Sequence, residues 1–211
     1  MACDFVFFRN RSVNSELVPK LFRQSIEGIA SYFIANSRVR PFGEKKKAGM
    51  GGPIVAGQSI ADVVVEPRSM LADANGAVLR GWRATGSSAP VAEVYCSVVR
   101  GGAVKAWKRH RQMTQRLLVP SGRVLFVIYD SRVESATSDS VMEIESGRDA
   151  YGLVIIPPML WYGFAGIASG ESIIVNSPNL IHDPTEIERL DSNTKQIPYA
   201  WNVQEGSRSR L

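Results

Sequence analysis

The chain has 211 residues, 45% of them hydrophobic, and a formal net charge of +5 at pH 7. It can bury a sizeable core, as one domain with an extension or as two small domains, and we favour the first. Its two cysteines, Cys3 and Cys96, cannot form a disulfide framework and lack metal-ligand spacing, which predicts a reducing, cytoplasmic compartment. No apolar run approaches the ~20 residues that span a bilayer, and charged residues interrupt the apolar cluster near the N-terminus. We therefore expect no membrane span and no secretory signal.

The N-terminal part differs from the rest of the chain. Residues 16–33 carry apolar side chains every three or four positions, which predicts an amphipathic helix; these are Val18, Phe22, Ile26, Ile29 and Phe33. The opposite face is not strongly basic, so we expect the helix to pack on the main domain or on a second subunit rather than on a membrane. Residues 38–57 are rich in glycine and contain three consecutive lysines, which predicts a linker or arm. We place the N-terminal extension at residues 1–57.

From Ile60 onwards the pattern changes to short strands separated by Gly, Pro, Ser and Asp. The predicted strands are Ile60–Glu66, Ala77–Trp82, Ala92–Val99, Ala103–Lys108, Gln115–Val119, Arg123–Tyr129, Ser140–Glu145, Leu153–Ile156, Tyr162–Ala165 and Ser172–Asn176. No convincing helix interrupts them. They predict an all-β sandwich or barrel of the jelly-roll kind over residues 58–205, with the tail from His182 to Trp201 as a covering loop or short helix.

The densest cationic run lies between Gly102 and Gly122. If Ala103–Arg111 is a strand, its side chains alternate. One face then carries Ala106, Lys108 and His110, and the other carries Lys105, Trp107 and Arg109. The first interpretation of this run is a solvated basic strand, because an exposed lysine needs no special explanation.

The same run keeps the spacing of a cupin motif, which has a Gly, a His-x-His, a Glu and a Gly; the matching residues are Gly102, Lys108, His110, Gln115 and Gly122. A second cupin motif, Pro-x-Gly-x-x-His, resembles the six residues from Pro157 to Tyr162. In metal-binding cupins these positions supply three imidazoles and a carboxylate. Here only His110 is kept, and a lysine at position 108 repels a divalent ion. We expect no metal and no other cofactor.

Within the cupins, the chain from about Asp62 to Trp201 resembles the dTDP-4-dehydrorhamnose 3,5-epimerase family and the related 4-keto-sugar isomerases. The resemblance is carried, in order, by Asp73–Gly76, Val94–Ser97, Lys105–Lys108, Ile156–Pro158, Trp161–Phe164, His182–Pro184 and Ile197–Trp201. It implies a cupin jelly-roll β-barrel, to which the predicted N-terminal helix is an extension. It also implies a homodimer and a nucleotide-sugar ligand.

The resemblance also assigns site positions, most of them with altered residues. Lys108 occupies the position of the base His, and Asn176 that of the acid Tyr. Other positions near the substrate and its phosphates fall on Asn75, Arg80, Tyr95, Lys105, Gln115 and Arg116. The tail has no carboxylate around Asn193 and Thr194 to orient the base. Because asparagine cannot donate a proton as an acid does, we expect single-site epimerisation or ketoisomerisation using Lys108, His110 and Tyr162.

Three functions follow from these observations. The first is an epimerase or isomerase of a nucleotide-linked 4-keto-6-deoxysugar in polysaccharide or deoxysugar biosynthesis. The second is a catalytically silent cupin that binds a sugar nucleotide or small anion. The third, which ranks last, is a nucleic-acid or anionic-polymer binder that uses the basic runs. For His110, Tyr162 and Gln115 the structural alternative stays open, since each can simply belong to the core.

Overall fold

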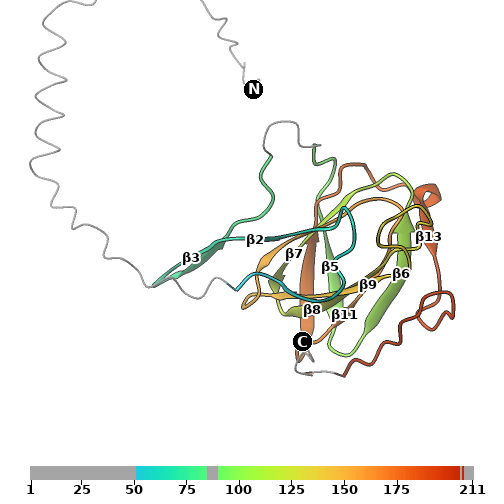
Figure 1. Ribbon diagram of the computed structural model, residues 1–211. Helices are drawn as coiled ribbons and strands as arrows, with labels where there is room; N and C mark the ends of the chain where they lie inside the picture. Colours follow the sequence, from blue (N-terminus) through green and yellow to red (C-terminus); the bar gives the residue numbers. More distant parts are fainter. Residues whose placement is uncertain (1–50, 85–89, 205, 207–211) are drawn as a thin grey trace, which may run out of the picture. The chain divides into compact units, whose positions relative to one another are not determined.

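The computed structural model describes residues 51–84, 90–204 and 206, and these form an almost entirely β structure (Figure 1). The predicted helix at residues 16–33 and the three-lysine segment lie outside the described residues. Within the described part, no helix is both long enough and apolar enough to span a membrane.

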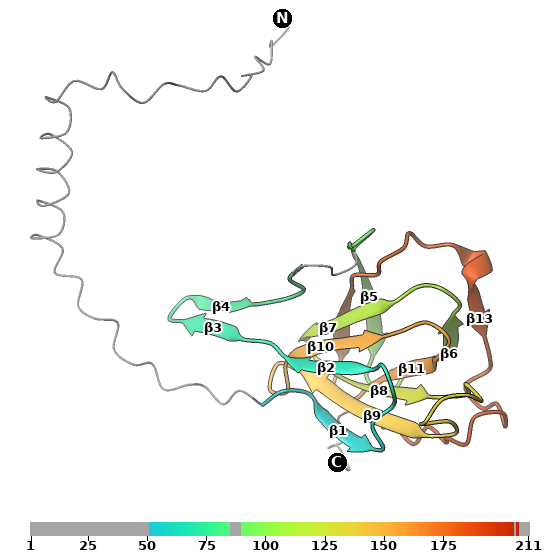
Figure 2. The same ribbon diagram turned by 45° about the horizontal axis from the view of Figure 1, so that its top comes forward.

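Two antiparallel sheets make up the domain. The six-stranded sheet has the order β1 (Ile54–Gly57), β9 (Val141–Gly147), β8 (Arg123–Tyr129), β11 (Trp161–Gly166), β6 (Val104–His110) and β13 (Ile187–Arg189). The five-stranded sheet has the order β2 (Val64–Pro67), β10 (Gly152–Ile156), β7 (Gln115–Ser121), β12 (Glu171–Asn176) and β5 (Tyr95–Arg100). A separate hairpin joins β3 (Met70–Asp73) to β4 (Gly76–Leu79), as Figure 2 shows. This confirms the predicted all-β jelly roll.

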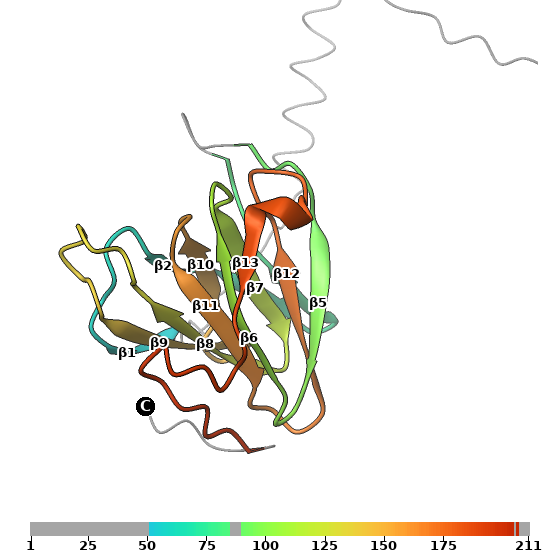
Figure 3. The same cartoon turned by 90° about the vertical axis from the view of Figure 1, so that its right-hand side faces the viewer.

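The main core consists of alternate residues of both sheets, which point at one another. Leu117 of β7 and Ile174 of β12 come from one sheet, and Phe126 and Ile128 of β8 come from the other; all four are at most 1% exposed. Burying such a side chain contributes about 1.5–3 kcal/mol each. Strand alternation thus produces the two-layer arrangement, in which β5 and β1 lie at opposite sides (Figure 3).

Three short strands were not predicted. Ile54–Gly57, which the sequence placed in the arm, is strand β1 and pairs with β9, from Ile54 opposite Glu145 to Gly57 opposite Met142. The strands β3 and β13 are also new, and β13 follows a 3-10 turn, η1 (Pro184–Glu186), within the predicted covering tail. Segments of three or four residues are too short to show a period of two, so only their pairing partners reveal them.

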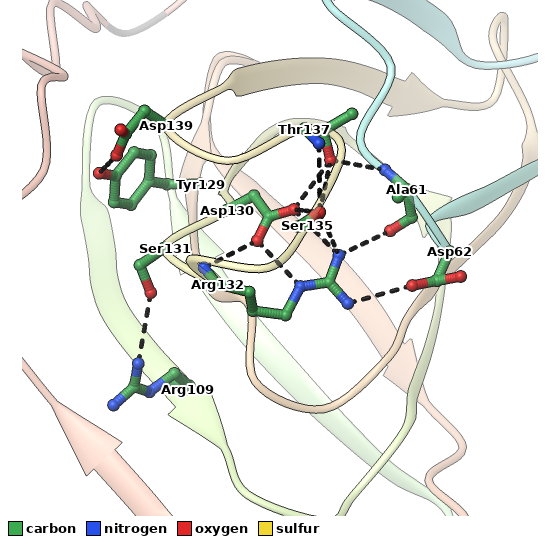
Figure 4. Close-up of polar contacts among 10 residues, drawn as sticks. All are labelled: Ala61, Asp62, Arg109, Tyr129, Asp130, Ser131, Arg132, Ser135, Thr137 and Asp139. Atoms are coloured by element: carbon green, nitrogen blue, oxygen red, sulfur yellow. Dashed lines mark hydrogen bonds and ion pairs between the residues drawn. The ribbon is translucent and has the colours of Figure 1, made fainter.

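A buried ion-pair network fastens the connection between β8 and β9 (Figure 4). The carboxylate of Asp130, 0% exposed, accepts hydrogen bonds from Arg132 at 2.9 Å, from Ser135 at 2.7 Å and from Thr137 at 2.8 Å. Burial alone would raise the pKa of Asp130, but these bonds outweigh it and hold the pKa below its usual range. Arg132 also pairs with Asp62 at 3.0 Å, which ties the loop to the segment before β2.

Candidate active site

An irregularity in the pairing of β6 with β11 decides which side chains share a face. Lys108 lies opposite Tyr162 and Lys105 lies opposite Phe164, so a step of three residues on β6 matches a step of two on β11. Tyr162 and Phe164 are two residues apart on β11 and point to the same side of the sheet. Lys108 and Lys105, which lie opposite them, therefore point to that side as well. The prediction that Lys105 points away from Lys108 is wrong, because simple alternation ignores this shift. Ala106, predicted on the same face as Lys108, instead packs with the Trp107 cluster.

The two lysines line a cavity of about 340 Å³, which we call the Lys108 cavity. Its wall also includes Ser97 of β5, Phe164 of β11 and Arg189 of β13. This volume lies at the small end of the range for ligand pockets. Three cationic residues and no carboxylate line it, so the Lys108 cavity favours an anionic or strongly polar ligand.

The Lys108 ammonium group is only partly exposed and sits against aromatic rings. Its Nζ lies 4.9 Å from the ring centroid of Tyr162 and 5.4 Å from that of Phe164. Among the described residues it makes no hydrogen bond and no ion pair. Burial, together with the charges of Arg189 and Lys105, lowers the pKa of Lys108 from 10.5 to about 8. A substantial share of neutral amine is therefore present just above neutral pH.

His110 is buried beside Lys108 and is held by a carboxylate. Its Nδ1 lies 2.7 Å from Oε2 of Glu186 in η1, while Glu186 Oε1 accepts the backbone N–H groups of Gln112 and Met113 at 2.6 and 2.7 Å. Burial lowers the pKa of His110, although Glu186 acts in the opposite direction. A neutral ring with its proton on Nδ1 leaves the Nε2 lone pair to accept from Gln115 Nε2 at 3.2 Å.

Carboxylate, imidazole and amide thus form one fixed chain. Burial would raise the pKa of Glu186, but the hydrogen bonds from Gln112, His110 and Met113 outweigh it, so Glu186 remains ionised. This carboxylate can stabilise a charged His110 if the ring takes a proton at Nε2.

Three buried polar atoms of the interior have no protein partner: the Tyr162 hydroxyl, Gln115 Oε1 and Asn176 Oδ1. Leaving such an atom unpaired costs about 1–3 kcal/mol. Burial raises the pKa of Tyr162 well above its usual value, so its hydroxyl stays protonated. Its ring stacks with that of His110, with centroids 6.0 Å apart. Unpaired donors and acceptors next to a cavity are the pattern expected where a polar ligand completes the hydrogen bonding.

Asn176 and Tyr95 pair across β12 and β5 on the same inner side. The Asn176 amide donates to Ser97 Oγ at 3.1 Å and to the Tyr95 carbonyl at 3.3 Å. Burial raises the pKa of Tyr95, and a hydrogen bond with Gln115 partly offsets that effect. The Tyr95 phenol therefore lies beside Asn176, the position at which the family resemblance implies an acid and this chain has an amide.

Of the predicted site residues, only Lys105 and Lys108 line the Lys108 cavity itself. Three predicted substrate contacts lie away from the whole group around Lys108 and His110. Asn75 and Arg80 are exposed, Asn75 in the turn of the β3–β4 hairpin and Arg80 directly after β4. Arg116 follows Gln115 on β7 and so points to the opposite face of the sheet, where its guanidinium stacks on Trp82 at 4.3 Å and donates to the Ser177 carbonyl at 3.2 Å. Alternation along β7 separates Arg116 from Gln115.

Sequence reasoning missed Glu186, Arg189 and Ser97. The predicted lack of a carboxylate concerned only the stretch around Asn193 and Thr194; the carboxylate that holds His110 is Glu186, which reaches it from η1. The local pattern Asp183-Pro-Thr-Glu does signal a helical turn, with Asp183 as N-cap accepting from Thr185. Ile187 pairs with His110 and so brings this turn to β6, and nothing in the sequence indicates that pairing.

Within the described part of the chain, no group of three or more His, Cys, Asp and Glu side chains could hold a metal ion. The residues at the cupin ligand positions are an amine, one imidazole, an amide and a phenol of raised pKa. This donor set does not fit a divalent metal.

The pairing order of two facing antiparallel sheets, with polar side chains gathered on their inner faces, defines a cupin. No model of a protein family matches the chain. It is 30% identical over 152 residues to the probable low-salt glycan biosynthesis epimerase Agl13 of Haloferax volcanii, an alignment that covers 69% of this chain and 97% of the relative. It is 23% identical over 105 residues to the spore coat polysaccharide biosynthesis protein SpsL of Bacillus subtilis, covering 49% of this chain and 70% of the relative.

Among solved structures, the dTDP sugar isomerase of Desulfovibrio desulfuricans superimposes with a TM-score of 0.65 at 34% identity, over 67% of this chain and 92% of that chain. The 4-keto-6-deoxy sugar epimerase NovW of Streptomyces spheroides shares the fold at a TM-score of 0.63 and 18% identity, over 78% of this chain and 88% of that one. The chain belongs to the family of cupin-type sugar-nucleotide epimerases and isomerases related to dTDP-4-dehydrorhamnose 3,5-epimerase.

Proposed function

We propose that this protein removes and returns a proton next to the ketone of a nucleotide-linked 4-keto-6-deoxysugar, as an epimerase or ketoisomerase in polysaccharide or deoxysugar biosynthesis. The observation that carries the proposal is that a free amine, Lys108, and a carboxylate-held imidazole, His110, both lie against the ring of Tyr162. The names of its relatives, an epimerase and a dTDP sugar isomerase, point the same way.

The chemistry requires few groups. A 4-ketone acidifies the hydrogens at C3 and C5, so a base must take one of them, a donor must stabilise the enolate, and an acid must return a proton. Lys108 and His110 are the candidate bases. Tyr162 and Tyr95 are protonated phenols that can donate, whereas Asn176 can only hydrogen-bond the substrate. Lys105 and Arg189 supply positive charge for the diphosphate.

The test is deuterium uptake from solvent. The protein is incubated in D₂O with dTDP-4-keto-6-deoxyglucose, and loss of the C3 and C5 proton signals is followed by NMR. We expect exchange in the wild type and none in Lys108→Ala. The matched control is Lys195→Ala, an exposed lysine of the tail, which should exchange as the wild type does. Absence of exchange with this and related keto-sugars contradicts the proposal.

A catalytically silent binder is the second candidate, and a specific observation favours it. Asn176 occupies the acid position, and its Oδ1 is one of the unpaired buried atoms that a ligand would satisfy. A silent binder predicts a higher melting temperature with nucleotide sugars but no exchange. A melting temperature that no nucleotide sugar raises contradicts both candidates.

The nucleic-acid alternative loses much of its basis, because the basic run is not a free cationic surface. Arg109 and Arg111 both bond to the Glu188 carboxylate, and Arg109 also stacks on Trp161 at 4.6 Å. Lys108 points into the Lys108 cavity instead of out to solvent. A gel-shift titration should therefore show only weak, salt-sensitive binding.

We also propose that the protein works as a homodimer. On the outer face of the five-stranded sheet, edge strand β5 exposes Val98. Val94, which directly precedes β5, is 64% exposed. Apolar side chains in such a row fit a second copy of the chain. Sedimentation should give a dimer that Val94→Glu weakens; a monomer at micromolar concentration contradicts this.

The cytoplasmic location stays a prediction from cysteine usage.

A further inference from the structure

We infer that Lys108 acts as a nucleophile, whose Nζ adds to the keto carbon of the sugar to form an imine, while His110 handles the proton. This inference rests on the proposed function, because it needs a ketone as substrate. It assigns the two candidate bases to different tasks and names the covalent intermediate.

The Lys108 amine is free to react with a carbonyl group. Among the described residues, no carboxylate and no hydrogen-bond acceptor engages its Nζ, whereas Lys105 Nζ donates to the Val98 carbonyl at 2.6 Å and the other basic residues of β6 are paired. An amine without partners can attack a carbonyl without first breaking an ion pair. Lys108 is thus the one basic side chain of strand β6, within the described part, whose nitrogen is left open toward a ligand.

The surroundings of the Lys108 nitrogen suit an iminium ion. Two aromatic faces, those of Tyr162 and Phe164, lie 4.9 and 5.4 Å from Nζ and can stabilise the delocalised cation of an iminium. Nearby cations favour the neutral amine that nucleophilic attack requires, which is how buried lysines are activated for imine formation. With a pKa of about 8, roughly a tenth of the amine is neutral at pH 7.

A separate base, His110, lies against one aromatic neighbour of Lys108, since its ring stacks on that of Tyr162. His110 is neutral, carries its proton toward Glu186 and presents the Nε2 lone pair to the interior. Gln115, which donates to Nε2 at 3.2 Å, has the Met113 sulfur as another partner, and sulfur is a weak acceptor. When a substrate C–H bond replaces this contact, the Gln115 amide needs a new acceptor, which an oxygen of the sugar can supply.

The reaction balances without any further reagent. The nitrogen lone pair forms a C–N bond, the C=O π electrons move to oxygen, and that oxygen leaves as water after taking up two protons. The resulting iminium withdraws electrons from the adjacent C–H bond, so His110 Nε2 takes the proton and an enamine forms. Reprotonation on the other face and hydrolysis by water then return the ketone and the free amine.

Reductive trapping tests the inference directly. The full chain is incubated with dTDP-4-keto-6-deoxyglucose and sodium cyanoborohydride, and the intact mass and peptide map are measured. We expect an added mass equal to that of the substrate less one oxygen atom, located on Lys108. Lys195→Arg, which changes an exposed lysine of the tail, should still be trapped. Lys108→Arg keeps the charge but cannot form the imine, and should show neither trapping nor deuterium exchange.

The outcomes separate the two proposals. Exchange without any adduct on the wild type, or exchange retained in Lys108→Arg, overturns the imine and leaves the proposed function standing. Neither exchange nor adduct with any keto-sugar overturns both. An adduct on another lysine, with Lys108 unmodified, also overturns the assignment.

Discussion

Replacing Lys108 by methionine should stabilise the fold while it abolishes activity. Methionine has nearly the length of lysine and suits the aromatic walls of Tyr162 and Phe164, but it carries no charge to desolvate. The lowered pKa of Lys108 means that folding opposes its protonated state. We therefore predict that Lys108 serves the function of the protein at the expense of its stability.

The free-energy cost of burying the charged Lys108 follows from its pKa. A value of about 8 in the fold against 10.5 in the unfolded chain is equivalent to roughly 3 kcal/mol while the amine is protonated, and partial exposure of Lys108 reduces this to about 2 kcal/mol. The cost is fully present below pH 8, where both states hold the proton. It falls between pH 8 and 10.5, where only the unfolded state holds it, and vanishes above that range.

The assay is urea unfolding of wild type and Lys108→Met at pH 7 and again near pH 10. The variant should be more stable by about 2 kcal/mol at pH 7, and the difference should shrink at the higher pH. Lys105→Met is the control, since Lys105 is exposed, and should change stability by less than about 0.5 kcal/mol. A Lys108→Met variant that is less stable than wild type at pH 7, or a difference independent of pH, refutes the reasoning.

Four further outcomes are expected. Wild-type deuterium exchange should rise with pH through a midpoint near 8, because only the neutral Lys108 amine reacts. Glu186→Gln should lower that exchange about a hundredfold at pH 7 by removing the charge that supports a protonated His110. Asp130→Ala should lower the free energy of unfolding by about 3 kcal/mol, since it removes the buried carboxylate on which Arg132, Ser135 and Thr137 converge. Gly163→Ala should cost about 1–3 kcal/mol, because its Cβ would lie 2.4 Å from that of Ala106.

Each of these has a distinct contrary result. Exchange that is flat between pH 7 and 9 would mean that Lys108 does not titrate in the reaction. A Glu186→Gln variant with unchanged exchange would remove His110 from the mechanism, and circular dichroism of the same sample controls for folding. Urea curves of Asp130→Ala or Gly163→Ala that overlay the wild-type curve would show that the Figure 4 network or the tight β6–β11 approach contributes nothing.

Much of the fold was readable from the sequence because half-buried strands repeat every two residues. Strand Arg123–Tyr129 was predicted with the bounds that the structure gives, and the core strands beside it within two residues of theirs. Strand β1 was hidden by the glycine-rich composition around Ile54–Gly57 and becomes visible only through its pairing with β9. Local periodicity carries no information about a partner strand far along the chain.

The site was predicted in part for the same reason. The cupin spacing correctly grouped Lys108, His110, Gln115 and Tyr162, since residues two apart on a strand share a face. Simple alternation failed for Lys105, because the register shift between β6 and β11 cannot be seen in the sequence of β6 alone. The spacing failed for Glu186 because a contact across 76 positions depends on how the tail folds back.

The most direct test of the account is a crystal structure of the full chain with a thymidine diphosphate sugar. We predict that the sugar ring lies in the Lys108 cavity, with C4 within bonding reach of Lys108 Nζ, the C3 or C5 side facing His110, and the diphosphate toward Lys105 and Arg189. A nucleotide sugar bound elsewhere, with the Lys108 cavity closed to it, would contradict the account.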